Sequence, residues 1–180
     1  MAVSMAPTKG NLLAAKNTLR LSKQGYEMLD KKRNILIREM MALIDEAKDV
    51  EKNIEATFKE AYAALESANL MMGCDTVYDI SHSQSIDENV NISLRSVMGV
   101  ELPMVRLSEE ETRPMYSFYS TGSAFDEAFC SFSEVKKLTS RLAQIENSVY
   151  RLAVNIKKTQ KRANALCNIT IPMYENIVKE

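Results

Sequence analysis

The stretch RLAVNIKKTQKRANALCNITIP, residues 151–172, has the residue pattern of one helix in a coiled coil. Its apolar and small residues recur at steps of three and four, which places them along one face of an α-helix. These residues are Leu152, Ile156, Thr159, Ala163 and Leu166. The stretch ends at Pro172, which lacks an amide hydrogen and clashes with the preceding turn, so a kink or a helix end is predicted there.

The same pattern extends upstream and predicts a helix from about residue 124 towards the C-terminus. Ser123 is a suitable N-cap, and Asp126 places a negative charge in the first turn, where it favours the helix dipole. Two rows of a heptad repeat are predicted to contact a partner helix. One row comprises Val135, Leu142, Val149, Ile156 and Ala163, and the other comprises Leu138, Ile145, Leu152, Thr159 and Leu166.

The N-terminal part of the chain carries a longer repeat of the same kind. Thr8 can cap its start, Gly73 can cap its end, and no proline lies between them. At 1.5 Å per residue, such a helix is about 95 Å long. Ser22, Arg33 and Thr57 interrupt its otherwise apolar rows, and Arg33 must pair or reach solvent there, which indicates a register device or a partner contact. The first row is Leu12, Leu19, Tyr26, Arg33, Met40, Ala47, Ile54, Ala61 and Ala68, and the second is Ala15, Ser22, Leu29, Leu36, Leu43, Val50, Thr57, Ala64 and Met71.

Residues 73–122 join the two helices and are too many for a simple loop between helices. Alternating residues in NVNISLRSV, 89–97, predict a strand, and VELPMVRL, 100–107, predicts a second strand after Met98-Gly99. Pro103 should then lie at a sheet edge or a bulge. One short hairpin cannot bury its apolar face by itself, so it is a candidate element for docking a partner. The candidate docking residues are Val90, Ile92, Leu94, Val97, Val100 and Leu102.

The sequence therefore predicts a mostly α fold, a long two-helix antiparallel coiled coil with a small central subdomain that contains a short β-hairpin. The 180 residues divide into an N-terminal helix, 1–72, a central hairpin subdomain, 73–122, and a C-terminal helix, 123–180, within one domain. Leu43 and Leu152 lie on second rows near the middle of the helices, where burial should be greatest.

The net charge is only −1, but the charges are unevenly distributed. Residues 1–38 have a net charge of +6 and residues 147–180 of +4, whereas residues 39–146 have a net charge of −11. Antiparallel pairing would bring the two basic ends together, and a basic end would attract an acidic protein surface. A helix flank that contacts only water explains the same charges equally well. The residues concerned are Lys31, Lys32, Arg33, Lys157, Lys158, Lys161 and Arg162.

No motif for catalysis is present, since the sequence has no Gly-rich phosphate loop, zinc-protease motif or nucleophile elbow. His82 is the only histidine and lies in a polar run, while Cys74, Cys130 and Cys167 are interpreted as small packing residues in a reducing cytoplasm. No apolar run of about 20 residues is present, so no direct membrane insertion is expected. We therefore predict a protein that is not an enzyme and that has no metal site and no cofactor. A nucleic-acid-binding helix is disfavoured by the pI near 6.0 and by the lack of interleaved aromatic residues.

Three segments resemble the D subunit of the V/A-type rotary ATPases, closer to its bacterial and archaeal members. They are PTKGNLLAAKNTLRLSKQGYEMLDKKRNIL at 7–36, SVMGVELP at 96–103 and SVYRLAVNIKKTQKRANALCNITIPMYENI at 148–177. Together they follow the family's order and span essentially the whole chain. Cys167 and Met173 stand where the family commonly has an acidic and a basic residue, so family contacts are not carried over to them. Family members usually continue past Glu180 with a longer charged helix.

The resemblance implies a central-stalk rotor subunit that transmits torque and performs no chemistry itself. Its coiled coil would enter the catalytic hexamer of A and B subunits, and its other end would join the F subunit and the membrane-side rotor adaptor subunit. Such a protein is cytoplasmic and peripheral to the cell membrane, with nucleotide and metal bound by other subunits. The basic residues then become candidates for facing the stator, and no nucleic acid is expected as a partner. A static coiled-coil adaptor or scaffold is the alternative function.

Overall fold

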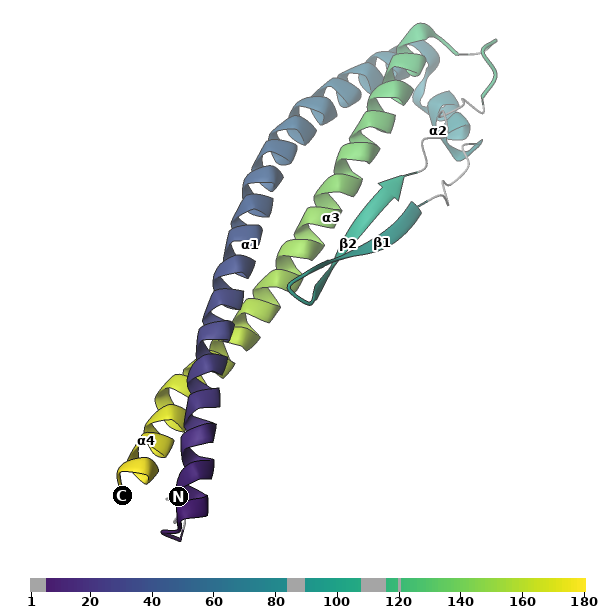
Figure 1. Cartoon of the computed structure of the whole chain (residues 1–180). Helices are drawn as coiled ribbons and strands as arrows, with labels where there is room; N and C mark the ends of the chain where they lie inside the picture. Colours follow the sequence, from purple (N-terminus) through teal and green to yellow (C-terminus); the bar gives the residue numbers. More distant parts are fainter. Residues whose placement is uncertain (1–5, 84–89, 108–115, 120) are drawn as a thin grey trace. The chain divides into compact units, whose positions relative to one another are not determined.

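The structure, a computed structural model, is mostly α-helical with one small β-hairpin, as the sequence predicts (Figure 1). It describes residues 6–83, 90–107, 116–119 and 121–180. The elements in chain order are α1 (Lys9–Met72), α2 (Cys74–Ser83), β1 (Val90–Val97), β2 (Val100–Leu107), α3 (Ser123–Ala165), the π-helix η1 (Leu166–Thr170) and α4 (Ile171–Lys179).

Packing divides the chain into two compact units. Unit 1 contains Met1–Met41, Val97–Val100 and Tyr150–Glu180, and unit 2 contains Ala42–Ser96 and Glu101–Val149. Both α1 and α3 contribute residues to each unit. The division into one domain of three consecutive segments stays a prediction.

Unit 1 is built on two antiparallel helical stretches. Lys23 contacts Glu175, with Nζ 2.7 Å from Oε1, and Arg33 contacts Gln160, so partners in α1 and in the C-terminal helices run in opposite directions. The predicted rows supply the core, because contact rows alone are removed from water in a helix pair. The buried row residues of unit 1 are Ala15, Ser22, Leu36, Leu152, Thr159 and Ala163.

Unit 2 repeats the antiparallel pairing, with Glu46 ion-paired to Arg141 and the ring of Tyr62 edge-on to Phe132. Its buried residues in α1, Ala61 and Ala68, lie on the first row rather than the second. Such a change of row is expected because an α-helix has 3.6 residues per turn and drifts against a strict seven-residue repeat. For this reason the prediction for Leu43 is wrong, since its side chain is half-buried, whereas Leu152 is fully buried as expected.

The ends of α1 follow the predicted caps. The Asn11 amide donates to the Thr8 hydroxyl oxygen over 3.3 Å, and Gly73 adopts a φ of +85°, a conformation that favours glycine. The start of α3 differs from the prediction, because Ser123 is already helical and the Gly122 carbonyl accepts the amides of Phe125 and Asp126.

Helix α2 was not predicted, because its sequence lacks a long periodic pattern. It begins directly after Gly73 and packs through Val77 and Ile80 against a cluster that includes Ala68 and Phe125. Tertiary packing therefore explains this short helix better than intrinsic propensity does.

The β-hairpin has the predicted strands and a two-residue turn. Met98 and Gly99 have φ values of 50° and 76°, which suit the tight turn that matches strand twist. The Val105 amide donates to Gln144 Oε1 in α3 over 2.9 Å, so this edge of β2 faces away from β1. Pro103 lies two residues earlier on the same edge, where its missing amide costs no ladder hydrogen bond.

The C-terminal helix does not end at Pro172. A π-helical turn, η1, stands immediately before α4, and the Ile171 amide donates to the Leu166 carbonyl oxygen five residues earlier. The wider turn accommodates the proline, which cannot donate to the carbonyl of residue 168. Pro172 thus lies in the first turn of α4.

Candidate functional site

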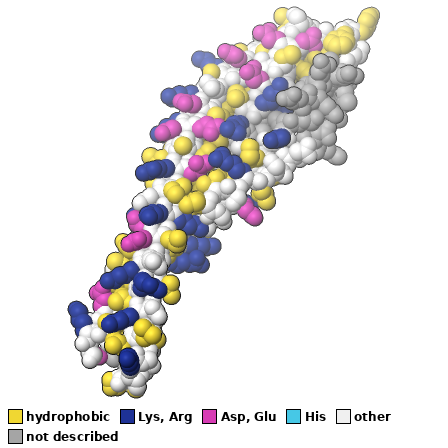
Figure 2. Space-filling view, in the orientation of Figure 1, with side chains coloured by type: hydrophobic (Ala, Val, Ile, Leu, Met, Phe, Trp, Pro, Cys, Tyr) yellow, Lys and Arg dark blue, Asp and Glu magenta, His cyan; other side chains and the backbone are white. Residues whose placement is uncertain are grey.

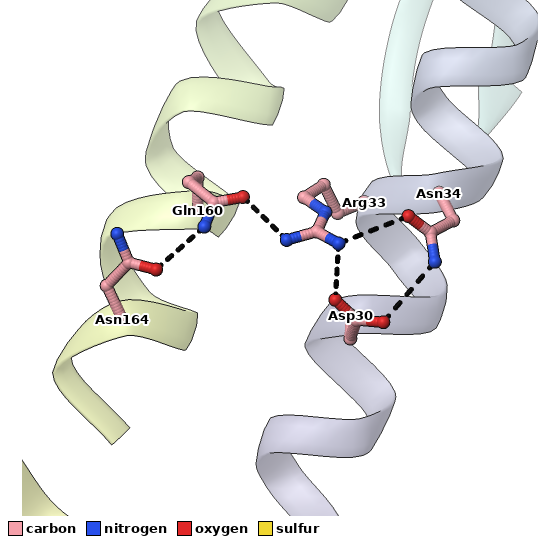
Figure 3. A network of polar contacts seen from close by, with 5 residues as sticks. All are labelled: Asp30, Arg33, Asn34, Gln160 and Asn164. Carbon is pink, nitrogen blue, oxygen red and sulfur yellow. Dashed lines mark hydrogen bonds and ion pairs between the residues drawn. The ribbon is translucent and has the colours of Figure 1, made fainter. Parts of the chain in front are cut away.

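A polar network within unit 1 joins α1 to α3 at Arg33 (Figure 3). Arg33 Nη1 donates to Gln160 Oε1 over 2.8 Å, and Arg33 Nη2 lies 2.6 Å from Asp30 Oδ1. Asn34 bonds both Asp30 and Arg33 over 3.3 Å, while Gln160 Nε2 donates to Asn164 Oδ1 over 2.7 Å. The guanidinium is therefore held by partners on two helices.

This network can form in only one heptad register. A slip by one heptad would replace Gln160 with Ala153 or Cys167, and neither offers an amide oxygen to Arg33. The apolar rows alone would tolerate such a slip, because a heptad repeat matches itself after seven residues. The register device suggested by Arg33 in the sequence thus has a structural basis.

A surface groove of about 570 Å³ lies beside the network. Its apolar lining comes from both helices, with Ile37 and Met40 on α1 and Ile156 on α3. The remaining lining residues are Arg33, Asn34, Ala153, Lys157, Gln160 and Lys161. The groove therefore combines an apolar lining with three basic side chains.

The structure brings together only part of the predicted basic set. Arg33, Lys157 and Lys161 line the groove, whereas the other four, Lys31, Lys32, Lys158 and Arg162, do not. The four members of the predicted set that lie on α3, Lys157, Lys158, Lys161 and Arg162, are exposed. None of the four has a hydrogen bond or ion pair with another residue of the described chain, which leaves their charges available to a partner. Over the helices of unit 1, Figure 2 shows Lys and Arg side chains beside exposed hydrophobic ones.

The hairpin divides its six candidate residues between two faces. Side chains alternate along a strand, so Val90, Ile92 and Leu94 share one face of β1 and Val97 lies on the other. In β2, Val100 and Leu102 are buried, at 3% and 4% exposure. By contrast, Ile92 and Leu94 are 67% and 59% exposed. Every residue of β1 from Val90 to Ser96 is exposed, and the face with Val90, Ile92 and Leu94 is the apolar one. This exposed apolar face of β1 is therefore what the hairpin offers to a partner.

Among the residues that the structure describes, two ionisable groups have shifted pKa values, and each shift has a local cause. Burial raises the pKa of Tyr116, and the hydrogen bond that its hydroxyl donates to Asp126 Oδ1 over 2.6 Å raises it further. The hydrogen bond from Lys23 lowers the pKa of Glu175. The first contact ties the segment before α3 to its first turn, the second joins α1 to α4, and neither group lines the groove.

His82 and the three cysteines are the reactive side chains that the sequence analysis considered. His82 is exposed, and its Nδ1 lies 3.0 Å from the Tyr78 carbonyl oxygen one helical turn away. The interpretation of the cysteines as packing residues is wrong, because Cys74, Cys130 and Cys167 are all exposed. No group of His, Cys, Asp and Glu suited to a metal ion occurs among the described residues. Within the same residues, no helix has the length and apolar character needed to cross a membrane.

The sequence reasoning missed the partners of Arg33. Asp30 lies one turn before Arg33, and Gln160 and Asn164 lie one turn apart on α3. Polar pairs at these spacings are a recognisable signal on a helix surface. Their connection across the two helices depends on the register, which the repeat pattern alone does not fix.

The chain is similar to one family of known proteins along nearly its whole length. A family model for the ATP synthase D subunit matches residues 11–180. The V-type ATP synthase D subunit of Thermotoga neapolitana is 44% identical over 177 residues, which cover 98% of this chain and 87% of that protein. The A-type ATP synthase D subunit of Methanobrevibacter smithii is 38% identical over 176 residues, covering 96% and 76%. That of Pyrococcus furiosus is 33% identical over 180 residues, covering 98% and 84%.

Proposed function

Because the chain belongs to the family of ATP synthase D subunits, we propose that it is the central-stalk rotor subunit of a V/A-type ATPase. In this role it transmits torque between the catalytic hexamer of A and B subunits and the membrane rotor that translocates ions. The family resemblance seen in the sequence is confirmed. The observation that carries the proposal is the match over residues 11–180, which includes the helices of both units and the hairpin.

Antiparallel helix pairing supports a mechanical role. Torque requires a stiff element with a fixed register, and the Arg33 network links the two helices of unit 1 at one register only. Coupling also requires asymmetry, because a symmetric shaft would bias all three catalytic sites equally. The chain has that asymmetry, because its two long helices differ in sequence and its hairpin contacts α3. The chain itself performs no chemistry in this proposal, and other subunits bind nucleotide and metal.

The exposed face of β1 is proposed to dock the F subunit or to tune the rate of ATP hydrolysis. Val90, Ile92 and Leu94 leave apolar area in water, and a docked partner would remove it. Replacing Ile92 and Leu94 with serine should weaken binding of the F subunit or change turnover while the helical circular dichroism stays unchanged. Wild-type affinity for the F subunit together with wild-type turnover would leave the hairpin with a structural role only.

Four exposed basic residues near the C-terminal end of α3 are proposed to face the stator on the cytoplasmic side of the membrane. A fourfold change of Lys157, Lys158, Lys161 and Arg162 to glutamine should alter the melting temperature little, because exposed charges contribute little to stability. It should weaken assembly or coupling most at low salt, where screening is least. Unchanged assembly, hydrolysis and ion pumping at low salt would indicate a flank that contacts only water.

Recovery of partners from native membranes tests the proposed function. The tagged chain should copurify with the nucleotide-binding A and B subunits and with the membrane-side adaptor. Purified alone, it should show no micromolar ATP binding by calorimetry. Recovery of a partner set that contains no nucleotide-binding protein would favour the static adaptor instead.

A further inference from the structure

The groove beside Arg33 has the chemistry of a binding site for an acidic protein segment. Its apolar lining, Ile37, Met40 and Ile156, lies next to the ammonium-bearing side chains of Lys157 and Lys161. These lysines are four residues apart on α3, so their side chains project from one helix face. The combination suits a ligand that presents an apolar group flanked by negative charge.

The basic side of the groove is partly preorganised. Asp30, Asn34 and Gln160 fix the Arg33 guanidinium, so little side-chain freedom is lost there on binding. Lys157 and Lys161 have no ion pair with any described residue, so both ammonium groups can pair with carboxylates of a partner. Met40 adds an unbranched side chain that adapts to the shape of an incoming apolar group.

We propose that this groove binds a segment of a stator protein that inserts one apolar side chain and pairs flanking carboxylates with Lys157 and Lys161. This assignment rests on the proposed function, because it takes the owner of the segment to be a protein that surrounds the shaft. The apolar side chain packs on Ile37 and Ile156, and the carboxylates give the contact a strong dependence on salt.

The residues that line the groove disfavour two other ligands, a second copy of the chain and a nucleic-acid strand. A second copy of the chain, docked groove to groove, would place Lys157 and Lys161 against their own equivalents, and like charges repel. A single nucleic-acid strand is bound through stacked aromatic side chains, and no aromatic residue lines this groove. An acidic protein segment satisfies both the charge and the apolar lining.

Photo-crosslinking identifies the occupant directly. Cys74, Cys130 and Cys167 are replaced by serine, and Ala153→Cys on the groove lining is labelled with a benzophenone maleimide in the assembled complex. Illumination and mass spectrometry should recover a stator peptide with an apolar residue flanked by Asp or Glu. A crosslink to a peptide without acidic residues, to a second copy of this chain, or to no partner would overturn the proposal.

Three variants test whether occupancy matters. Ala153→Trp fills the groove without changing charge and should weaken assembly about tenfold, the loss expected when one apolar anchor is excluded. Lys157→Gln with Lys161→Gln should weaken assembly at low salt and much less at high salt. The matched control, Lys16→Gln with Arg20→Gln, removes two exposed charges four residues apart on α1, outside the groove, and should have little effect.

The outcomes separate this proposal from the proposed function. If the wild-type chain and all three variants assemble equally well with the catalytic subunits, the groove assignment alone is overturned. If the wild-type chain does not assemble with the catalytic subunits, both the groove assignment and the proposed function are overturned. Circular dichroism of each variant identifies any loss of folding, and the lysine variant, which changes only exposed residues, then decides the question.

Discussion

Burial varies from residue to residue along the contact rows, so leucine-to-alanine changes at different row positions should lower the free energy of unfolding by different amounts. Leu152 is fully buried, and Leu152→Ala should lower the free energy of unfolding by about 2–5 kcal/mol. Leu43 is half-buried, and Leu43→Ala should cost about 1 kcal/mol, because less apolar area is lost. Leu13→Ala is the control, since that side chain is 64% exposed. Urea unfolding followed by circular dichroism measures all three, and equal losses for Leu152 and Leu13 would contradict the observed packing.

The Lys23–Glu175 pair predicts a small dependence of stability on pH. Lys23 holds the pKa of Glu175 below its ordinary value of 4.5, so the pair stabilises the fold at neutral pH. That contribution is present above the unfolded pKa and is lost as the pH falls through the lowered folded pKa. In Lys23→Gln the pKa of Glu175 should rise towards its ordinary value. A carboxyl-carbon NMR titration of both proteins measures this, and identical titration curves would show that the pair is absent in solution.

At the scale of elements, the Arg33 network should hold α1 and α3 in one register. Nitroxide labels placed at Lys31 and Arg162, both exposed, in a chain with serine at its three cysteines should give one main distance by electron spin resonance. Gln160→Leu removes the oxygen that Arg33 bonds and keeps the size of the side chain. A second population, in which α3 is displaced along α1 by about 10 Å, seven residues of helix rise, should then appear as a second distance between the labels. One unchanged distance in the variant would mean that packing alone sets the register.

The π-helical turn predicts how α4 responds to loss of its proline. Pro172→Ala restores an amide donor and removes the ring clash, so η1 should convert to an α-helical turn. A π turn holds about one more residue than an α turn, so conversion should rotate α4 by about 100°. The rotation would take Glu175 away from Lys23, now 2.7 Å distant. The pKa of Glu175 in the variant reports this, and an unchanged, lowered pKa would show that the wide turn does not depend on Pro172.

For the whole molecule, periodicity predicted what depends on local spacing and missed what depends on tertiary contacts. The two long helices, the caps at Thr8 and Gly73 and the hairpin could be predicted, because each follows from residues close together in sequence, whereas the short helix α2 could not. The exact burial at Leu43 could not, because it depends on how the contact rows drift between two long helices. The groove could not either, since its lining comes from residues more than 100 positions apart, and their meeting requires a fixed register.

The basic residues illustrate the same limit at the site. Composition identified seven candidates, but only the register shows that Arg33, Lys157 and Lys161 share one groove with an apolar lining. The alternation of apolar and polar residues likewise predicted two strands. Only the tertiary contacts show that Val100 is buried and Ile92 is exposed. Charge and periodicity therefore predict which segments carry a basic or an apolar surface, and the tertiary contacts determine which residues of those segments are exposed together.

The proposed rotor role requires this chain to turn relative to the catalytic subunits, and observation of single complexes tests that rotation most directly. The assembled complex is fixed to glass through its catalytic hexamer, and a gold particle is attached to Cys74, exposed at the start of α2, with Cys130 and Cys167 replaced by serine. On addition of ATP, the particle should rotate in one direction and stop at three equivalent angles when ATP is scarce, one for each catalytic site. A particle that stays at one angle while the same complexes hydrolyse ATP would contradict the rotor assignment and leave the static adaptor.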